Sequence, residues 1–307
     1  MAPLSAAVNE KCKPDPNVHP RRAAWLAWIP LALLPVGAIA FRAALAPWAF
    51  MWILCAAIFF GCKWQAWWDS DARASFGRNL GFLFAWPGMD AANFLDASRT
   101  AQRPRAPEWL RAALNTGAGA VLLWSVVRRV PPGHELLSGW IGMVGLILLL
   151  HFGTFHIASL LWRHSGVDAP PIMQSPLAAH SLSDFWGRRW NLGFRQLTHR
   201  LIFRPARSLW GAPTALLLSF AVSGLIHDLV ISLPARRGYG LPTLYFVAQG
   251  AGVLFERSRF GSRLGIDRGI RGWSFALVCT AGPASLLFHP PFVRNVILPF
   301  LSVLRAR

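Results

Sequence analysis

Charged side chains are scarce in this chain of 307 residues, of which only 14% are Asp, Glu, Lys or Arg. Acidic residues number 13 and lysine occurs three times, so arginine carries nearly all of the positive charge. Hydrophobic residues make up 54% of the chain, and the mean hydropathy is +0.39. A soluble domain needs more charge than this to cover its surface. The composition therefore excludes an ordinary soluble protein and predicts an all-α, multi-pass integral membrane protein.

Cysteine is also rare, and the four cysteines do not have the spacing of a metal site. They are Cys12, Cys55, Cys62 and Cys279. Three of them lie inside or beside long apolar runs, where a thiol behaves as a small hydrophobic group. We therefore expect the cysteines to pack in the protein interior and to bind no metal.

Two histidine-containing stretches have spacings that merit a check for chemistry. His151 and His156 are five residues apart and lie on different faces of a helix, which argues against a shared metal. His164 and Asp168 are spaced as in some soluble acyltransferase signatures, but the flanking His or Gly is missing. We therefore expect structural roles for all four residues.

The net charge of +18 raises the question of nucleic-acid binding. The arginines form no single basic face or arm, because they occur in short clusters between apolar runs. Arginine-rich and arginine-poor loops alternate along the chain, as the positive-inside rule requires of a membrane protein. This pattern excludes a nucleic-acid partner and predicts that both termini are cytoplasmic. The Arg, Ala, Gly and Pro richness suggests a GC-rich bacterial genome, and hence the bacterial inner membrane.

About eight apolar runs approach the length that a membrane-spanning helix needs, with shorter runs allowed for tilt or burial. They cover residues 23–41, 43–62, 112–127, 136–162, 209–233, 241–255, 273–289 and 292–304. The runs 241–255 and 292–304 are short enough to be re-entrant or half-buried. We find no internal repeat and no low-complexity tract. The sequence therefore predicts one membrane-embedded domain, residues 1–307, with about eight transmembrane helices.

Two connecting regions, residues 64–110 and 163–208, are too long and too aromatic to be simple loops. Tryptophan is enriched where a helix meets the lipid headgroups. These regions are therefore expected to form interfacial or re-entrant helices.

His227 lies in the apolar run LLLSFAVSGLIHDLVISL, about 20 Å along the helix from Pro213. Ionisable groups inside a span are costly and tend to mark a reaction site, a cavity or a proton path. Ser223 and Gly224 lie one turn earlier and leave room on the same face. Asp228 points about 100° away from His227 around the helix. Two interpretations remain open: a buried imidazole that bonds another helix, or a reactive group.

The stretch SDFWGRRWN, residues 183–191, combines aromatic rings, arginines, an acid and an amide. In a helix, Asp184 and Arg188 would pair at i,i+4. Phe185, Trp186 and Trp190 would form an apolar side, while Arg189 and Asn191 would project elsewhere. A membrane anchor made of Trp and Arg explains most of this composition, but not Asn191.

The two stretches together resemble the paired signature of the membrane-bound O-acyltransferases. Residues 181–191, SLSDFWGRRWN, and residues 223–228, SGLIHD, are similar to the FWGRRWN and SG-x-x-H-E blocks of the wax-synthase branch. Residues 84–90, FAWPGMD, resemble a block upstream of these in bacterial members. The resemblance covers roughly residues 80–260. The family often has Glu where this chain has Asp228, which puts a positioning role for that acid in doubt.

What the resemblance implies is acyl transfer from acyl-CoA, as co-substrate, to the hydroxyl of a lipophilic alcohol, without a cofactor or metal. The family's catalytic residues correspond to His227, as general base, and Asn191. Arg188 and Arg189 are candidates for binding the phosphates of coenzyme A. Further candidate substrate-binding residues are Trp186, Trp190, Ser223 and Asp228.

Other functions remain open at this point. The acceptor could be a sterol, terpenoid, polyketide or glycan hydroxyl, with acetyl as the donor group. A membrane transporter is another interpretation, in which His227 relays protons. Transporters usually contain inverted repeats, and the lack of a repeat in this sequence favours the enzyme.

Overall fold

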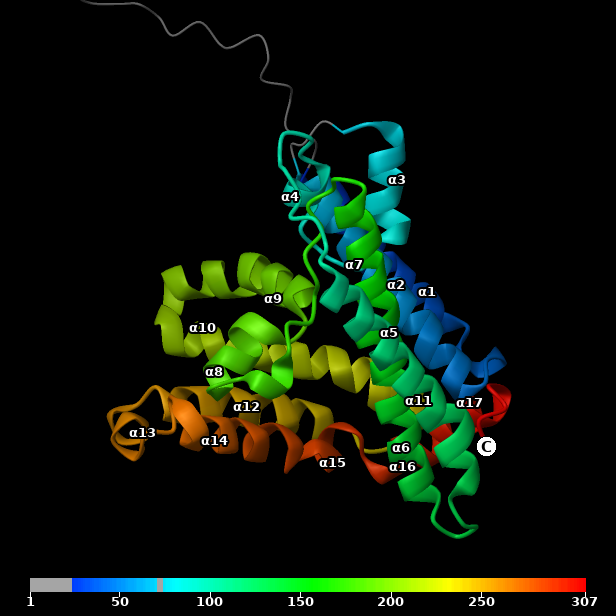
Figure 1. Cartoon of the computed structure of the whole chain (residues 1–307). Helices are drawn as coiled ribbons and strands as arrows, with labels where there is room; N and C mark the ends of the chain where they lie inside the picture. Colours follow the sequence, from blue (N-terminus) through cyan, green and yellow to red (C-terminus); the bar gives the residue numbers. More distant parts are fainter. Residues whose placement is uncertain (1–23, 71–73) are drawn as a thin grey trace, which may run out of the picture.

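The structure, a computed structural model, describes residues 24–70 and 74–307. Within this part of the chain it consists of helices joined by turns and contains no strand (Figure 1). The all-α fold class is therefore confirmed. Cys12 lies outside the described ranges, as do the basic residues before the first apolar run, Lys11, Lys13, Arg21 and Arg22, and Arg73 in the first connecting region.

The helices of the N-terminal half include most of the long apolar segments. They are η1 (Ala24–Ala27), α1 (Ile29–Ala40), η2 (Arg42–Ala44), α2 (Pro47–Trp68), α3 (Phe76–Ala85), α4 (Ala91–Leu95), α5 (Ala106–Val121), η3 (Leu122–Val126), η4 (Val127–Arg129), α6 (Glu135–Ile147), η5 (Leu148–Thr154) and α7 (Phe155–His164). Here η3 and η5 are wider π-helical turns: η3 continues α5, and η5 connects α6 with α7.

The helices of the C-terminal half carry the two sequence motifs. They are η6 (Pro176–Ala178), α8 (Leu182–Asp184), η7 (Phe185–Arg189), α9 (Leu192–Thr198), η8 (His199–Phe203), α10 (Arg204–His227), η9 (Asp228–Ser232), α11 (Leu233–Ala235), α12 (Leu241–Glu256), α13 (Arg259–Leu264), α14 (Gly269–Ala281), α15 (Ala284–Leu287), α16 (Pro290–Phe292), η10 (Val293–Ile297) and α17 (Leu298–Val303). The motif helix, α8 with η7, faces α12 and α14, which run side by side in Figure 1.

Fewer full-length spans are present than the sequence predicts. Four helical segments of the described chain are long and apolar enough to cross a membrane: Pro47–Trp68, Ala106–Arg129, Glu135–His164 and Leu192–Ala235. A fifth is possible if Gly269–Leu287 and Pro290–Val303, which meet at a 58° bend, form one broken span. The runs at 23–41 and 241–255 form helices too short to count, and those at 273–289 and 292–304 are the two halves of the bent pair.

The segment Leu192–Ala235 is 44 residues long, but it is not one straight rod. Gly211 interrupts it with non-helical angles, φ 79° and ψ 170°. A positive φ is readily adopted only by glycine, and Pro213 follows in the first turn after the break, where its missing N–H costs no hydrogen bond. The chain turns back there, as the left side of Figure 1 shows. The second arm corresponds to the predicted span 209–233.

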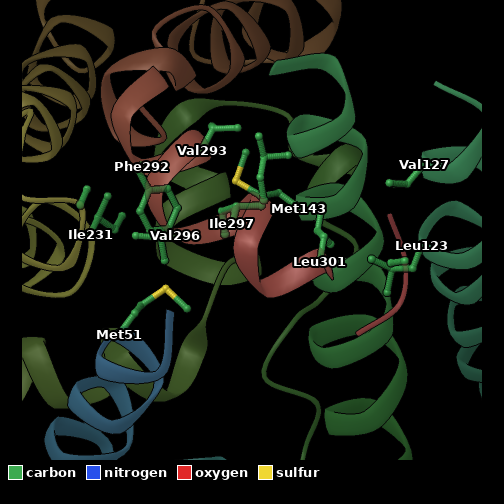
Figure 2. Close-up of a cluster of buried hydrophobic side chains, with 13 residues drawn as sticks. Met51, Leu123, Val127, Met143, Ile231, Phe292, Val293, Val296, Ile297 and Leu301 are labelled. Atoms are coloured by element: carbon green, nitrogen blue, oxygen red, sulfur yellow. The ribbon is translucent and has the colours of Figure 1, made fainter. Parts of the chain in front are cut away.

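The C-terminal bent segment is buried among the earlier helices. Its side chains Phe292, Val293, Val296, Ile297 and Leu301 form a cluster with residues of α2, α6 and η9 (Figure 2). Two glycines of α6, Gly139 and Gly142, allow this approach. A Cβ atom added at Gly139 would lie 2.2 Å from Val293 Cγ1, and one added at Gly142 would lie 2.4 Å from Leu301 Cδ1. Small residues at such contacts are typical of helix packing in membranes. The short run 292–304 is therefore half-buried in the bundle, as expected.

The first aromatic connecting region forms short helices with one apolar side exposed. Phe76 and Phe84 of α3 are exposed, whereas Phe82 is fully buried. Lys63, at the end of α2, is buried and donates a hydrogen bond from Nζ to the carbonyl of Gly88, 2.7 Å away. The 84–90 block is thereby fixed to a spanning helix.

Candidate active site

The motif helix is short and ends at Arg189, two residues before Asn191. Ser181 caps it by accepting a hydrogen bond from the amide of Asp184, at 3.1 Å. The last turn is π-helical and closes with the amide of Trp190 donating to the carbonyl of Phe185, at 2.9 Å. Asn191 then takes a left-handed conformation, φ 43°, and begins α9. The helix predicted for this stretch is therefore present, but it stops one residue before Trp190.

Asp184 binds both arginines of the motif. Its Oδ1 lies 2.8 Å from Arg188 Nε, which confirms the predicted i,i+4 pair, and its Oδ2 lies 2.6 Å from Arg189 Nε. The prediction that Arg189 projects elsewhere is wrong, because the π-helical turn brings residues five apart onto one side of the helix. Neither arginine is therefore an unpaired cation.

Asp184 is only 4% exposed, and it lies outside the membrane-spanning segments. Burial raises the pKa of its carboxyl group, but hydrogen bonds from Arg189, the amide of His180 and Arg188 outweigh this effect, so that the pKa is lowered. A lowered pKa in the folded state means that the ionised carboxylate stabilises the fold. This stabilisation is complete above the unfolded pKa of about 3.9 and is lost as the pH falls through the folded value.

Asp184→Asn is therefore expected to destabilise the protein by about 1–3 kcal/mol at pH 7, because the buried carboxylate loses its charge and its charged hydrogen bonds to two arginines that are partly exposed. Thermal unfolding of the purified protein in detergent, followed from pH 7 to pH 3, measures this. The difference between wild type and variant should be constant down to about pH 4 and shrink below it. If the difference in stability between wild type and Asp184→Asn stayed constant down to pH 3, the ionised Asp184 carboxylate would not be the stabilising group.

The aromatic rings of the motif lie on two sides of the helix. Phe185 stacks on Trp190, with ring centroids 5.6 Å apart and 13° between the planes. Trp186 points the other way, into α10 and α12, where it contacts Phe220 and Phe246, each at 5.7 Å. The second connecting region therefore reaches inward among the helices, rather than lying wholly outside them.

Asn191 caps the helix that follows it. Its Oδ1 accepts a hydrogen bond from the amide of Phe194, at 3.4 Å. Its backbone amide lies 3.2 Å from the sulfur of Met173. Two residues later, Gly193 packs closely against Met89. A Cβ atom added at Gly193 would lie 3.3 Å from the backbone nitrogen of Met89. In the described part of the chain no group accepts a hydrogen bond from Asn191 Nδ2, so this amide nitrogen remains available as a donor.

His227 is the last residue of α10 and lies in the helical arm that corresponds to the predicted span 209–233. Its Nδ1 is 2.7 Å from the carbonyl oxygen of Ser223. A carbonyl oxygen accepts only, so Nδ1 carries the proton and Nε2 has the free lone pair. The ring lies 4.3 Å from that of Phe246, centroid to centroid. The imidazole is thus held in one tautomer, and no described residue bonds its Nε2.

The hydroxyl of Ser223, a candidate substrate ligand, donates within its own helix. It bonds the carbonyl oxygen of Ser219, 2.9 Å away. The side chain therefore has a partner already. Ser223 contributes to the site through its backbone carbonyl group, which orients the His227 ring.

Asp228 does not contact the imidazole beside it. Its carboxylate accepts hydrogen bonds from the amides of Gly240, at 2.8 Å, and Thr243, at 3.0 Å, and from the Thr243 hydroxyl. These amides lie at the start of α12, where a negative charge is favourable. A hydrogen bond from Ser232, at 2.8 Å, completes the set. Asp228 therefore joins the His227 helix to α12.

His227 and Asn191 are not in direct contact, since no hydrogen bond or ring contact joins them in the described chain. A continuous series of ring contacts connects their surroundings. It runs from His227 to Phe246 at 4.3 Å, Trp186 at 5.7 Å, Phe185 at 5.0 Å and Trp190 at 5.6 Å, next to Asn191. The two motif blocks thus belong to one packed unit that is joined through α12.

A large cleft opens beside the motif helix, with a volume of about 1120 Å³. Its polar lining includes three arginines, Arg111, Arg188 and Arg189, and its apolar lining includes Phe152 and Trp190. His227 and Asn191 do not line it. The cleft therefore suits the charged part of a ligand rather than the reacting atoms.

The other polar candidates form no metal site, although His156 is among the residues that line the cleft. Within residues 24–70 and 74–307, no three His, Cys, Asp or Glu side chains come together as a metal site would require. Asp168 lies 3.6 Å from Arg99 and does not pair with His164. Cys55, Cys62 and Cys279 are free thiols.

Several residues of α12 contact the motifs and were not singled out from the sequence, among them Phe246, Gln249 and Glu256. Glu256 is 2% exposed and accepts hydrogen bonds from the amides of Leu182, at 2.6 Å, and Ser183, at 3.2 Å. An acid at the end of an apolar run is a signal that could have indicated Glu256. Phe246 resembles an ordinary residue of an apolar helix, whereas the amide of Gln249 in the same apolar run is a second polar signal.

Comparison with known proteins finds similarity over the segment that holds both motif blocks. Residues 169–248, which include both motif blocks, match the model of the membrane bound O-acyl transferase family. The long-chain-alcohol O-fatty-acyltransferase of Simmondsia chinensis is 38% identical over 143 aligned positions, covering 42% of this chain and 40% of the relative. The probable long-chain-alcohol O-fatty-acyltransferase 9 of Arabidopsis thaliana is 33% identical over 149 positions, covering 44% of each chain.

The matches span about two fifths of the length of these curated relatives. They confirm the resemblance that the FWGRRWN and SG-x-x-H blocks indicated. Residues 169–248 are therefore similar to the membrane bound O-acyl transferase family, and the relatives they resemble are long-chain-alcohol O-fatty-acyltransferases.

Proposed function

We propose that this protein transfers an acyl group from acyl-CoA to the hydroxyl of a lipophilic alcohol and forms an ester. The observation that carries the proposal is the hydrogen bond from His227 Nδ1 to the carbonyl of Ser223, 2.7 Å long. This bond leaves Nε2 unprotonated, with a free lone pair, within an apolar helix bundle. A fixed imidazole of this kind is suited to take a proton from an alcohol.

In the proposed reaction, Nε2 accepts the hydroxyl proton while the alcohol oxygen attacks the thioester carbonyl. The carbon–sulfur bond of the resulting tetrahedral intermediate then breaks. The coenzyme A sulfur leaves with the proton from His227, which restores the neutral ring. Negative charge develops on the carbonyl oxygen during the attack, and the free Nδ2 of Asn191 is the candidate donor to it.

The large cleft beside the motif helix is the candidate binding site for the charged part of acyl-CoA. Arg111 makes only a 3.5 Å contact with Ser175, and Arg188 is largely exposed despite its ion pair. Guanidinium groups bind phosphate well, so these arginines are the candidates for the phosphates of coenzyme A. The acyl chain and the alcohol are apolar and can enter from the bilayer. We further propose that the protein lies in a bacterial inner membrane with both termini cytoplasmic.

The test is acyl transfer in membranes from cells that express the protein. Radiolabelled palmitoyl-CoA is supplied with a mixed pool of long-chain alcohols, and the products are compared with those of membranes without the protein. Ester formation that depends on the protein is the expected result. Parallel reactions with sterol, terpenoid and polyketide alcohols, and with acetyl-CoA, identify a different acceptor or donor. No ester from any pair would contradict the proposed function.

A further inference from the structure

One face of α12 contacts both motif blocks. Phe246 touches the rings of His227 and Trp186, and it is 5% exposed. Gln249 lies about one turn later, and Glu256 two turns after that, so the three side chains share a face. The relative positions of the two blocks therefore depend on this face.

Gln249 is 1% exposed, and both ends of its amide are bonded. Its Oε1 accepts a hydrogen bond from Trp186 Nε1, at 3.2 Å. Its Nε2 donates to the carbonyl oxygen of Cys279 in α14, at 2.7 Å. Because one end must accept and the other must donate, the amide has a single orientation. The indole of Trp186 is thereby fixed to two other helices.

A buried amide is costly to desolvate, and an apolar side chain would fill this position at lower cost. Packing alone therefore does not account for a glutamine here. What the amide adds is direction, since a hydrogen bond fixes the indole ring in one position whereas apolar contacts do not.

We infer that Gln249 is a positioning residue for acyl transfer, which acts through Trp186 on both motif blocks. Trp186 contacts Phe246, which packs on the His227 ring, and it contacts Phe185, which stacks on Trp190 beside Asn191. Gln249 lies one residue beyond the segment that matches the family model. The inference rests on the proposed function.

The test replaces the amide with an apolar group of similar size, Gln249→Met. We expect kcat per folded protein to fall about tenfold, because small displacements of catalytic groups are costly. KM should change less than about twofold, since no substrate contact is removed. The matched control is Gln196→Met, at an exposed glutamine of α9, which should leave kcat unchanged. A residue with only a structural role would lower the amount of folded protein and not its kcat.

A double-mutant cycle tests whether the effect passes through the indole. In a Trp186→Phe background, which lacks the N–H donor, Gln249→Met should add less than about a twofold loss. An undiminished loss in that background would overturn the inference. So would an unchanged kcat in the single variant.

A second readout does not depend on activity. In protein labelled with ¹⁵N at the tryptophan indoles, the Trp186 signal is identified as the one missing from Trp186→Phe. Gln249→Met should shift that signal, and an unmoved signal would overturn the inference. If the wild type made no ester while the signal shifted, the hydrogen bond would stand, but the proposed function, and with it the positioning role, would fail.

Discussion

His227→Ala is expected to abolish ester formation, with a loss of kcat of about 10²–10⁴-fold. The structure leaves only one nitrogen of this ring free, because Nδ1 is committed to the Ser223 carbonyl at 2.7 Å. Without Nε2, the alcohol must lose its proton to water or to no group at all. Initial rates with palmitoyl-CoA and a long-chain alcohol, at saturating concentrations, measure the loss.

The control is His134→Ala, which removes an exposed histidine at the start of α6. It should leave the rate unchanged. The His227→Ala protein must also insert and elute as wild type does in size-exclusion chromatography, so that the loss is chemical. Ester formation at the wild-type rate by His227→Ala would remove this residue from the mechanism.

Those parts of the site that depend on local spacing were predictable from the sequence. The position of His227 in a long apolar helix followed from the apolar run around it, and the Asp184–Arg188 pair followed from the helical period. The second partner of Asp184, Arg189, was not predictable, because its placement depends on a π-helical turn. One extra residue per turn changes which side chains share a face of the helix. No residue of the motif indicates that its last turn is π-helical.

The number of spans was overestimated for a similar reason. Hydropathy identifies apolar runs, but it does not distinguish a helix that crosses the membrane from one that bends or is buried in the bundle. The predicted spans 273–289 and 292–304 meet at a bend of 58° between Leu287 and Pro290, which no feature of the hydropathy indicates. Helix α12 is apolar but has only 16 residues.

The contacts of α12 were not predictable because they depend on tertiary packing. Phe246 and Gln249 meet the motif helix across 60 or more residues of chain. The sequence alone does not indicate how closely α12 packs against the motif helix. The same limit applies to the His227–Asn191 relationship, which the structure describes as a series of ring contacts rather than a direct contact.

Asn191→Asp is expected to lower kcat by about 10²–10³-fold, which is the usual cost of losing one oxyanion donor. An aspartate keeps the oxygen that caps α9 through the Phe194 amide. It also tolerates the left-handed conformation of this position, φ 43°. What it lacks is the Nδ2 donor. The substitution therefore separates the proposed chemical role from the structural one.

Asn191→Gly provides the complementary variant. Glycine adopts the same backbone conformation without strain and costs only a few tenths of a kcal/mol as a cap. If the donor is what matters, both variants should fold and both should lose activity to a similar extent. If Asn191→Asp keeps the wild-type kcat while Asn191→Gly does not, the asparagine serves the reaction only by starting α9, and the oxyanion donor must be sought elsewhere in the bundle.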